Sequence, residues 1–240
     1  MEELKVQIIG ANKLKVLDLV NRFGVIANKQ IFRYFDDEIT KHSIYKILQD
    51  LENMGVVAKG NIGRIYYVYI RPSATPLVSE PMYKFNKLNQ TELLHDLRVS
   101  YYIIEQYKRI KETNKYKNVS FITERELIDE SLIEKDELTD TNFTRTIEKL
   151  KRHMADGILI TENFEGVLNK IAIEYELTQK AKPTYEKILK SYQSTYDQGD
   201  IRAVIYIVKG RRIQRKIEQV MTEQGYDFRI DFRDADDVFN

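Results

Sequence analysis

The chain contains no cysteine, no tryptophan and only four prolines among its 240 residues. Without cysteine there can be no disulfide, no thiol nucleophile and no cysteine-ligated zinc, and the only imidazole ligands are His42, His95 and His153. A large charge of one sign is also lacking, because 38 basic residues nearly balance 37 acidic ones. Any surface that binds nucleic acid must therefore be local.

Long hydrophobic runs are absent too. No segment reaches the roughly 20 apolar residues of a membrane-spanning helix, and the start of the chain has no signal-peptide pattern. We therefore expect a cytoplasmic protein that does not associate with membranes. The hydrophobic share of 42% is still enough to build the cores of one large or two modest domains.

Residues 11–71 have the pattern of a winged helix-turn-helix domain. Apolar side chains at helical spacing predict a first helix that ends at Gly24, a second helix capped by Asn28, and a third helix from Thr40 to Gly55. Two strands are then predicted on either side of the turn at residues 60–63. This order is typical of a DNA-binding module.

The third predicted helix is expected to lie in the major groove of double-stranded DNA. Its outward positions carry the side chains that would contact the duplex: Lys41, His42, Ser43, Tyr45, Lys46 and Gln49. The lysines suit phosphates, and the uncharged polar side chains suit base edges. Lys59 and Arg64, on the two strands, would reach the neighbouring DNA backbone. The alternative is a winged helix that binds protein through the same face.

Three of the four prolines fall within residues 72–90, which predicts a linker between two domains. The second domain, residues 91–235, is expected to open with a helix over 91–111. It ends in a strand, helix and strand between residues 201 and 232, an order typical of α/β structure. The chain as a whole is therefore predicted to be α+β.

Acidic residues interrupt two short apolar runs between residues 155 and 180. Asp156 begins the first run, Glu174 and Glu176 lie on the second, and the turn-rich segment between them predicts a β-hairpin. Because strand residues alternate between faces, Glu174 and Glu176 share one face, with Asp156 across the hairpin. Three carboxylates would suit Mg²⁺, which polarises a phosphodiester and activates water. The alternative is an amphipathic hairpin whose polar face lies in water.

Four segments together resemble the C-terminal domain of the replication-relaxation family: ADGILI at residues 155–160, IAIEYELTQK at 171–180, the helix over 185–192 and the strand AVIYIV at 203–208. Proteins of this family occur on plasmids and integrative elements. Their C-terminal domain resembles the PD-(D/E)xK nuclease fold, that of restriction endonucleases. The resemblance therefore implies an α/β nuclease-like domain after the winged helix.

The resemblance also implies catalytic roles for four residues. Asp156 would be the motif aspartate and Glu174 the motif glutamate. Glu176 stands where the motif has lysine, and Lys180 on the following turn would supply the missing cation; Ala155 replaces the usual proline. An acid in the lysine position often marks a domain that has lost cleavage. A Mg²⁺-dependent endonuclease with a degenerate motif and a non-catalytic domain both stay open.

The leading hypothesis is a DNA-binding protein of a mobile element that acts in plasmid replication, mobilisation or its regulation, and that nicks DNA if its acids hold a metal. Replication or transfer proteins would be partners, and a homodimer is an expected assembly because winged helices often dimerise. The alternatives are a regulator without catalysis, a small-molecule sensor, and a tandem winged-helix replication initiator with residues 126–176 as its second module. The elements predicted after residue 201 argue against the tandem arrangement.

Basic residues gather near the end of the chain: Arg202, Lys209, Arg211, Arg212, Arg215 and Lys216. A cationic face on the helix predicted over 210–224 would follow phosphates, or would serve only solubility. The sequence leaves both interpretations open.

Overall fold

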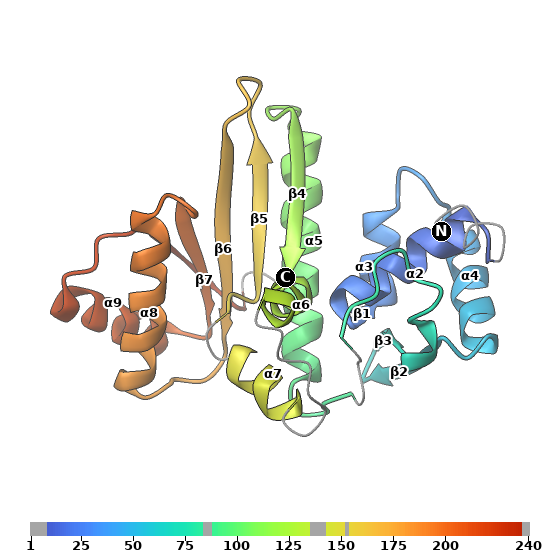
Figure 1. Cartoon of the computed structure of the whole chain (residues 1–240), viewed down its shortest axis with the longest axis horizontal. Coiled ribbons are helices and arrows are strands. Elements are labelled where there is room, and N and C mark those ends of the chain that lie inside the picture. Colours follow the sequence, from blue (N-terminus) through green and yellow to red (C-terminus); the bar gives the residue numbers. More distant parts are fainter. Residues whose placement is uncertain (1–8, 84–87, 135–142, 152–153, 237–240) are drawn as a thin grey trace. The chain divides into compact units, whose positions relative to one another are not determined.

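The structure, a computed structural model, describes residues 9–83, 88–134, 143–151 and 154–236 of the chain. It divides into two compact units, Met1–Lys108 and Arg109–Asn240, which are described separately (Figure 1). No helix among the described residues has both the length and the apolar character needed to cross a membrane.

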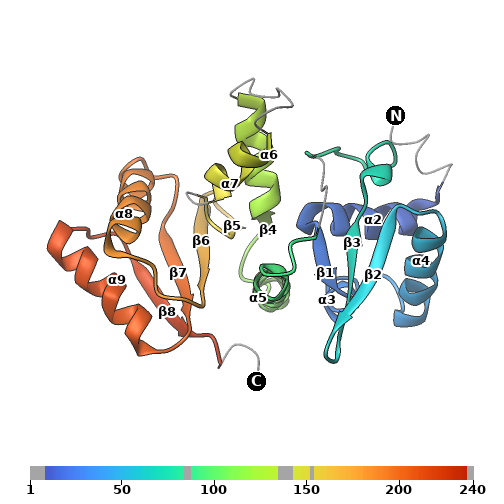
Figure 2. The ribbon, with the colours of Figure 1, turned by 90° about the horizontal axis from the view of Figure 1, so that it is seen from below.

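The first unit combines helices with a small antiparallel sheet. Its elements are α2 (Ala11–Phe23), β1 (Val25–Ala27), α3 (Asn28–Tyr34), α4 (Lys41–Asn53), β2 (Val57–Ile62) and β3 (Ile65–Ile70). β3 lies between β1 and β2 and is antiparallel to both (Figure 2). The three helices and the strands β2 and β3 agree with the elements predicted for residues 11–71, whereas the short strand β1 was not predicted.

Local signals in the sequence explain the bounds of α4. The Thr40 hydroxyl accepts a hydrogen bond from the backbone N–H of Ser43 at 3.2 Å, which satisfies one of the free donors at the helix start. Ile44, Ile47, Leu48 and Leu51 form a buried stripe along one side of the helix. Gly55 follows with a positive φ of 73°, a backbone conformation that ends the helix at little cost for glycine.

The segment predicted as a linker is packed against the first unit where the structure describes it. The Asp18 carboxylate on α2 accepts bonds from the backbone N–H and the hydroxyl of Ser79, at 2.8 and 2.6 Å. Asn21 donates to the carbonyl of Glu80 at 3.0 Å, and Val78 is completely buried. Residues 84–87 lie outside the described residues, so a free linker stays a prediction for those positions.

Most of α5 (Leu93–Glu112) belongs to the first unit, although the sequence pattern predicted that residues 91–111 open the second domain. Leu93 and Leu97 of α5 pack into a buried cluster of the first unit, and a polar anchor joins α5 to the end of α3. The buried Lys108 ammonium forms ion pairs with Asp36 and, at 2.7 Å, with Asp37. Arg33 pairs with Glu105 at 3.3 Å, one turn before Lys108. Such contacts between distant segments leave no periodic signal in the sequence.

The second unit contains a five-stranded sheet in the order β4-β5-β6-β7-β8. Its elements are β4 (Asn118–Thr123), α6 (Glu124–Glu134), α7 (Phe143–Lys151), β5 (Gly157–Glu162), β6 (Leu168–Glu176), α8 (Lys182–Asp197), β7 (Ala203–Val208), α9 (Arg211–Gln224) and β8 (Ile230–Asp234). β4, β5 and β6 are antiparallel neighbours, and β6, β7 and β8 are parallel ones. A second winged helix over residues 126–176 would have the β5–β6 hairpin as its wing, and its sheet would end there. In the structure the sheet continues from β6 into β7 and β8, which does not fit that arrangement.

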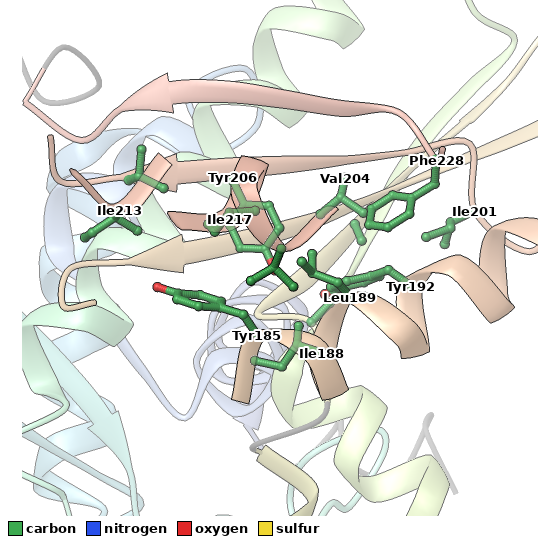
Figure 3. Close-up of a cluster of buried hydrophobic side chains, with 14 residues drawn as sticks. Tyr185, Ile188, Leu189, Tyr192, Ile201, Val204, Tyr206, Ile213, Ile217 and Phe228 are labelled. Atoms are coloured by element: carbon green, nitrogen blue, oxygen red, sulfur yellow. The ribbon is translucent and has the colours of Figure 1, made fainter. Parts of the chain in front are cut away.

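Helices α8 and α9 cover one face of the parallel half of this sheet. Side chains from both helices and from β7 meet there in a hydrophobic core (Figure 3). Tyr185 and Leu189 of α8, Ile217 of α9, and Val204 and Tyr206 of β7 are almost completely buried in it. The face of the sheet that carries Val204 and Tyr206 is therefore shielded from water.

Candidate functional sites

Helix α4 presents the side chains that the sequence predicted for DNA contact. Lys41, His42, Tyr45, Lys46 and Gln49 are exposed, and Ser43 is half-buried, on the side opposite the buried stripe. The Tyr45 ring packs against Phe32, with the ring centroids 4.7 Å apart, yet 56% of Tyr45 remains exposed. The exposed side of α4 is therefore polar, with one partly supported aromatic ring.

Two of the side chains predicted to contact DNA, Lys59 and Gln49, bond to other side chains of the protein. The Lys59 ammonium forms an ion pair with Glu52 at 2.9 Å and donates a hydrogen bond to Gln49 at 3.1 Å. In contrast, the side chains of Lys41 and Lys46 form no hydrogen bond or ion pair with any other described residue. The charge available to a ligand on α4 is therefore that of Lys41 and Lys46.

The hairpin between β2 and β3 carries a second exposed surface. Arg64 lies in its turn, is exposed, and has no ion-pair partner within the described part of the chain. Beside it, Ile62, Ile65 and Tyr66 are exposed, Tyr66 by 66%. The sequence pattern predicted a role for Arg64 but not for its apolar neighbours, because alternation along a strand does not show where the covered part of a sheet ends.

The acidic residues of the second unit meet across β5 and β6. Gly157 pairs with Ile173 in the antiparallel register, so that Asp156 lies opposite Glu174. The Asp156 carboxylate accepts a hydrogen bond from the backbone N–H of Tyr175 at 2.6 Å. Asp156 and Glu174 are thus neighbours, as the predicted hairpin implied.

Glu174 and Glu176 share a face of β6, and that face is the one covered by α8. In the parallel register they lie beside Tyr206 and Val208, which belong to the buried core. The hydroxyl of Tyr192 on α8 donates a hydrogen bond to Glu174, and Lys180 pairs with Glu176 at 2.5 Å. The alternative of a polar face in water is therefore wrong, because α8 covers this face and leaves Glu174 and Glu176 buried.

Electrostatic interactions within this group are strong. Burial, followed by repulsion from Asp156, raises the pKa of Glu174 to about 8, against the opposing effects of Lys180 and Tyr192. Burial disfavours the charged form of Lys180, but Glu176 and Glu174 outweigh it and raise the Lys180 pKa above its ordinary value. Burial and the nearby Glu174 also raise the pKa of Tyr192.

The predicted metal set of Asp156, Glu174 and Glu176 does not form a recognisable metal site. Across the residues that the structure describes, no three histidine, aspartate or glutamate side chains are arranged to hold a metal ion. Glu176 forms an ion pair with Lys180, and Asp156 and Glu174 each accept a hydrogen bond. Mg²⁺ binding stays a prediction, and His153 lies outside the described residues.

Comparisons with known proteins add little. No family model matches the chain, and no curated protein matches it. Among solved structures, a pre-specific restriction endonuclease BsaWI–DNA complex is similar with a TM-score of 0.28 and 9% sequence identity, over 94% of this chain and 88% of that chain. A TM-score this low does not establish a common fold, so no family is assigned.

Proposed function

We propose that the chain is a DNA-binding protein whose first unit is a winged helix. The observation that carries this proposal is the exposed side of α4, where Lys41 and Lys46 have no partner among the described residues. Cations without an ion-pair partner remain available to phosphates, and the third helix of a winged helix enters the major groove.

The rest of the unit supports the same orientation on DNA. Ser43 and Tyr45 lie beside the two lysines, where they would meet base edges, and Arg64 on the hairpin would meet the adjoining backbone. Lys59 is expected to contribute less than the sequence suggested, because Glu52 already neutralises it. Gln49, bonded to Lys59, would have to exchange partners before it could contact a base.

Replacing both lysines, in Lys41→Ala/Lys46→Ala, is expected to weaken binding to a random-sequence duplex. It should also reduce the slope of log K against log salt by about 2, because each phosphate contact contributes about 0.9. Fluorescence anisotropy at a series of KCl concentrations measures both effects. The matched control is Lys13→Ala/Lys15→Ala, which removes two lysines that pair with Asp50 and Glu38. Equal slopes for the two variants would rule out α4 as the contact helix.

Metal-dependent cleavage of DNA is a second candidate, favoured by one observation. Asp156 and Glu174 lie opposite each other and repel, and a divalent cation relieves repulsion between carboxylates. Against it, the third predicted ligand, Glu176, is paired with Lys180. We therefore propose binding without cleavage, with Lys180 as the structural counter-charge of Glu176.

Calorimetric titration of Mg²⁺ and Mn²⁺, beside a nicking assay on supercoiled plasmid, separates the two candidates. We expect neither metal binding nor nicking for the natural chain, and no difference in either assay for Asp156→Asn/Glu174→Gln. Metal binding and nicking that both vanish in this variant would establish a metal-dependent nuclease. Circular dichroism of the variant confirms that it is folded.

The resemblance to the replication-relaxation family adds a biological setting. It implies DNA of a plasmid or integrative element and partners from replication or transfer. This part of the proposal depends only on the sequence motifs between residues 155 and 208. A homodimer on DNA likewise stays a prediction, tested by the stoichiometry of the complex in sedimentation.

A further inference from the structure

Four cations crowd the beginning of α9: Lys209, Arg211, Arg212 and Arg215. All four are exposed, and none of their side chains forms a hydrogen bond or ion pair with another residue that the structure describes. Asp234, which lies opposite Val208 in the parallel register, accepts a hydrogen bond from the backbone N–H of Asp236. Within the described residues, no ion pair therefore neutralises the four cations, hereafter the α9 cluster.

The stability of α9 does not explain this cluster. Backbone dipoles give the start of a helix a partial positive charge, so that cations there are unfavourable and acids favourable. The first turn of α9 contains no acid, and Gly210 provides no side-chain cap. The acidic Glu218 and Glu223 stand in the second half of the helix, which is the reverse of the stabilising order. An arrangement that opposes folding indicates a negatively charged ligand.

The cluster lies at the carboxyl ends of two parallel strands. Lys209 directly follows β7, and its backbone N–H donates to the carbonyl of Glu176, the last residue of β6, at 3.1 Å. Ligands of open α/β sheets commonly bind at this edge, beside helix N-termini. The partly exposed Lys180, which pairs with Glu176, lies four residues beyond that strand end. The α9 cluster is therefore placed where such a sheet receives an anion.

We propose that the α9 cluster binds the phosphodiester backbone of double-stranded DNA and gives the second unit its own contact surface. The choice of DNA as the polyanion rests on the proposed function. Arg211 and Arg215 are one turn apart, about 6 Å along the helix axis, which suits a row of phosphates. Protein interfaces usually need exposed large hydrophobic side chains as anchors. In the described part of the chain, such side chains lie on elements other than α9, which favours DNA over a protein partner.

The test uses the full chain with Arg211→Gln/Arg212→Gln/Arg215→Gln and a duplex selected by the natural protein. The slope of log K against log salt should fall by about 2 to 3, because three phosphate contacts are lost. Sequence preference should be unchanged, since backbone contacts do not read bases. The variant's Tm should be equal or slightly higher, because cations are removed from a helix start.

The matched control is Lys115→Gln/Lys187→Gln/Lys190→Gln, which removes three exposed cations spread over other parts of the second unit. Slopes equal to this control would overturn the inference and leave the cluster a solubility feature. If Lys41→Ala/Lys46→Ala alone reduces binding, the inference fails and the proposed function stands. If the α9 variant alone reduces binding, the inference stands and α4 is not the contact helix. No DNA binding by the natural chain, with cluster-dependent binding to poly-glutamate, would overturn both and assign the cluster to an acidic protein.

Discussion

At pH 8, Glu174→Gln should have a higher free energy of unfolding than the natural protein. Burial, and then the charge of Asp156, raises the Glu174 pKa to about 8 from an ordinary 4.5. Between these values the folded chain keeps a proton that the unfolded chain has released. Stability must therefore fall as the pH rises through this window and level off above it. Each unit of pKa difference corresponds to about 1.4 kcal/mol, so the effect amounts to several kcal/mol.

Urea unfolding between pH 4.5 and 9, with a chelator present, measures this dependence. Glutamine imitates the protonated acid, so the variant should lose the decline between pH 5 and 8. The control is Glu165→Gln in the exposed β5–β6 loop, whose profile should follow that of the natural protein. A natural profile that is flat across this window would show that Glu174 is ionised in the folded state.

The anchor of α5 should give the second large effect. Asp36→Ala/Asp37→Ala leaves the buried Lys108 ammonium without its two carboxylates. Burial by itself disfavours that charge, and the aspartates outweigh it, which raises the pKa of Lys108. Removing one side of a buried ion pair costs about 3 kcal/mol or more. Because Asp36 and Asp37 are 32% and 76% exposed, water can solvate part of the remaining charge, and the free energy of unfolding of the first unit should fall by about 1 to 3 kcal/mol.

A third substitution provides the control for this prediction. Adding Lys108→Met removes the buried charge and fills its place with an apolar chain, which should restore most of the lost stability. Glu38→Ala, which breaks the exposed pair with Lys15, should cost less than about 1 kcal/mol. If the triple variant were no more stable than the double variant, the two aspartates would stabilise the first unit by a contact other than the one with Lys108.

Periodicity in the sequence predicted most elements of both units, though not the short β1, and it predicted the juxtaposition of Asp156 with Glu174. It succeeded there because hairpin registers and helix stripes are local properties. It failed for the environment of Glu174 and Glu176, since alternation tells which residues share a face and not whether a helix covers that face. The engagement of Lys59 by Glu52 and of Lys108 by Asp36 was missed for a related reason. Ion pairs between separate elements depend on tertiary packing.

The mixed sheet of the second unit has a consequence for the order of folding. β5 and β6 pair across a short loop, whereas β6 and β7 can pair only after the chain has crossed over through α8. Short loops close at a lower entropic cost, so the hairpin should form first. Glu174 then remains hydrated until α8 docks and brings Tyr192 against it. Its proton is therefore taken up late, and alkaline pH should slow the docking of α8 rather than the formation of the hairpin.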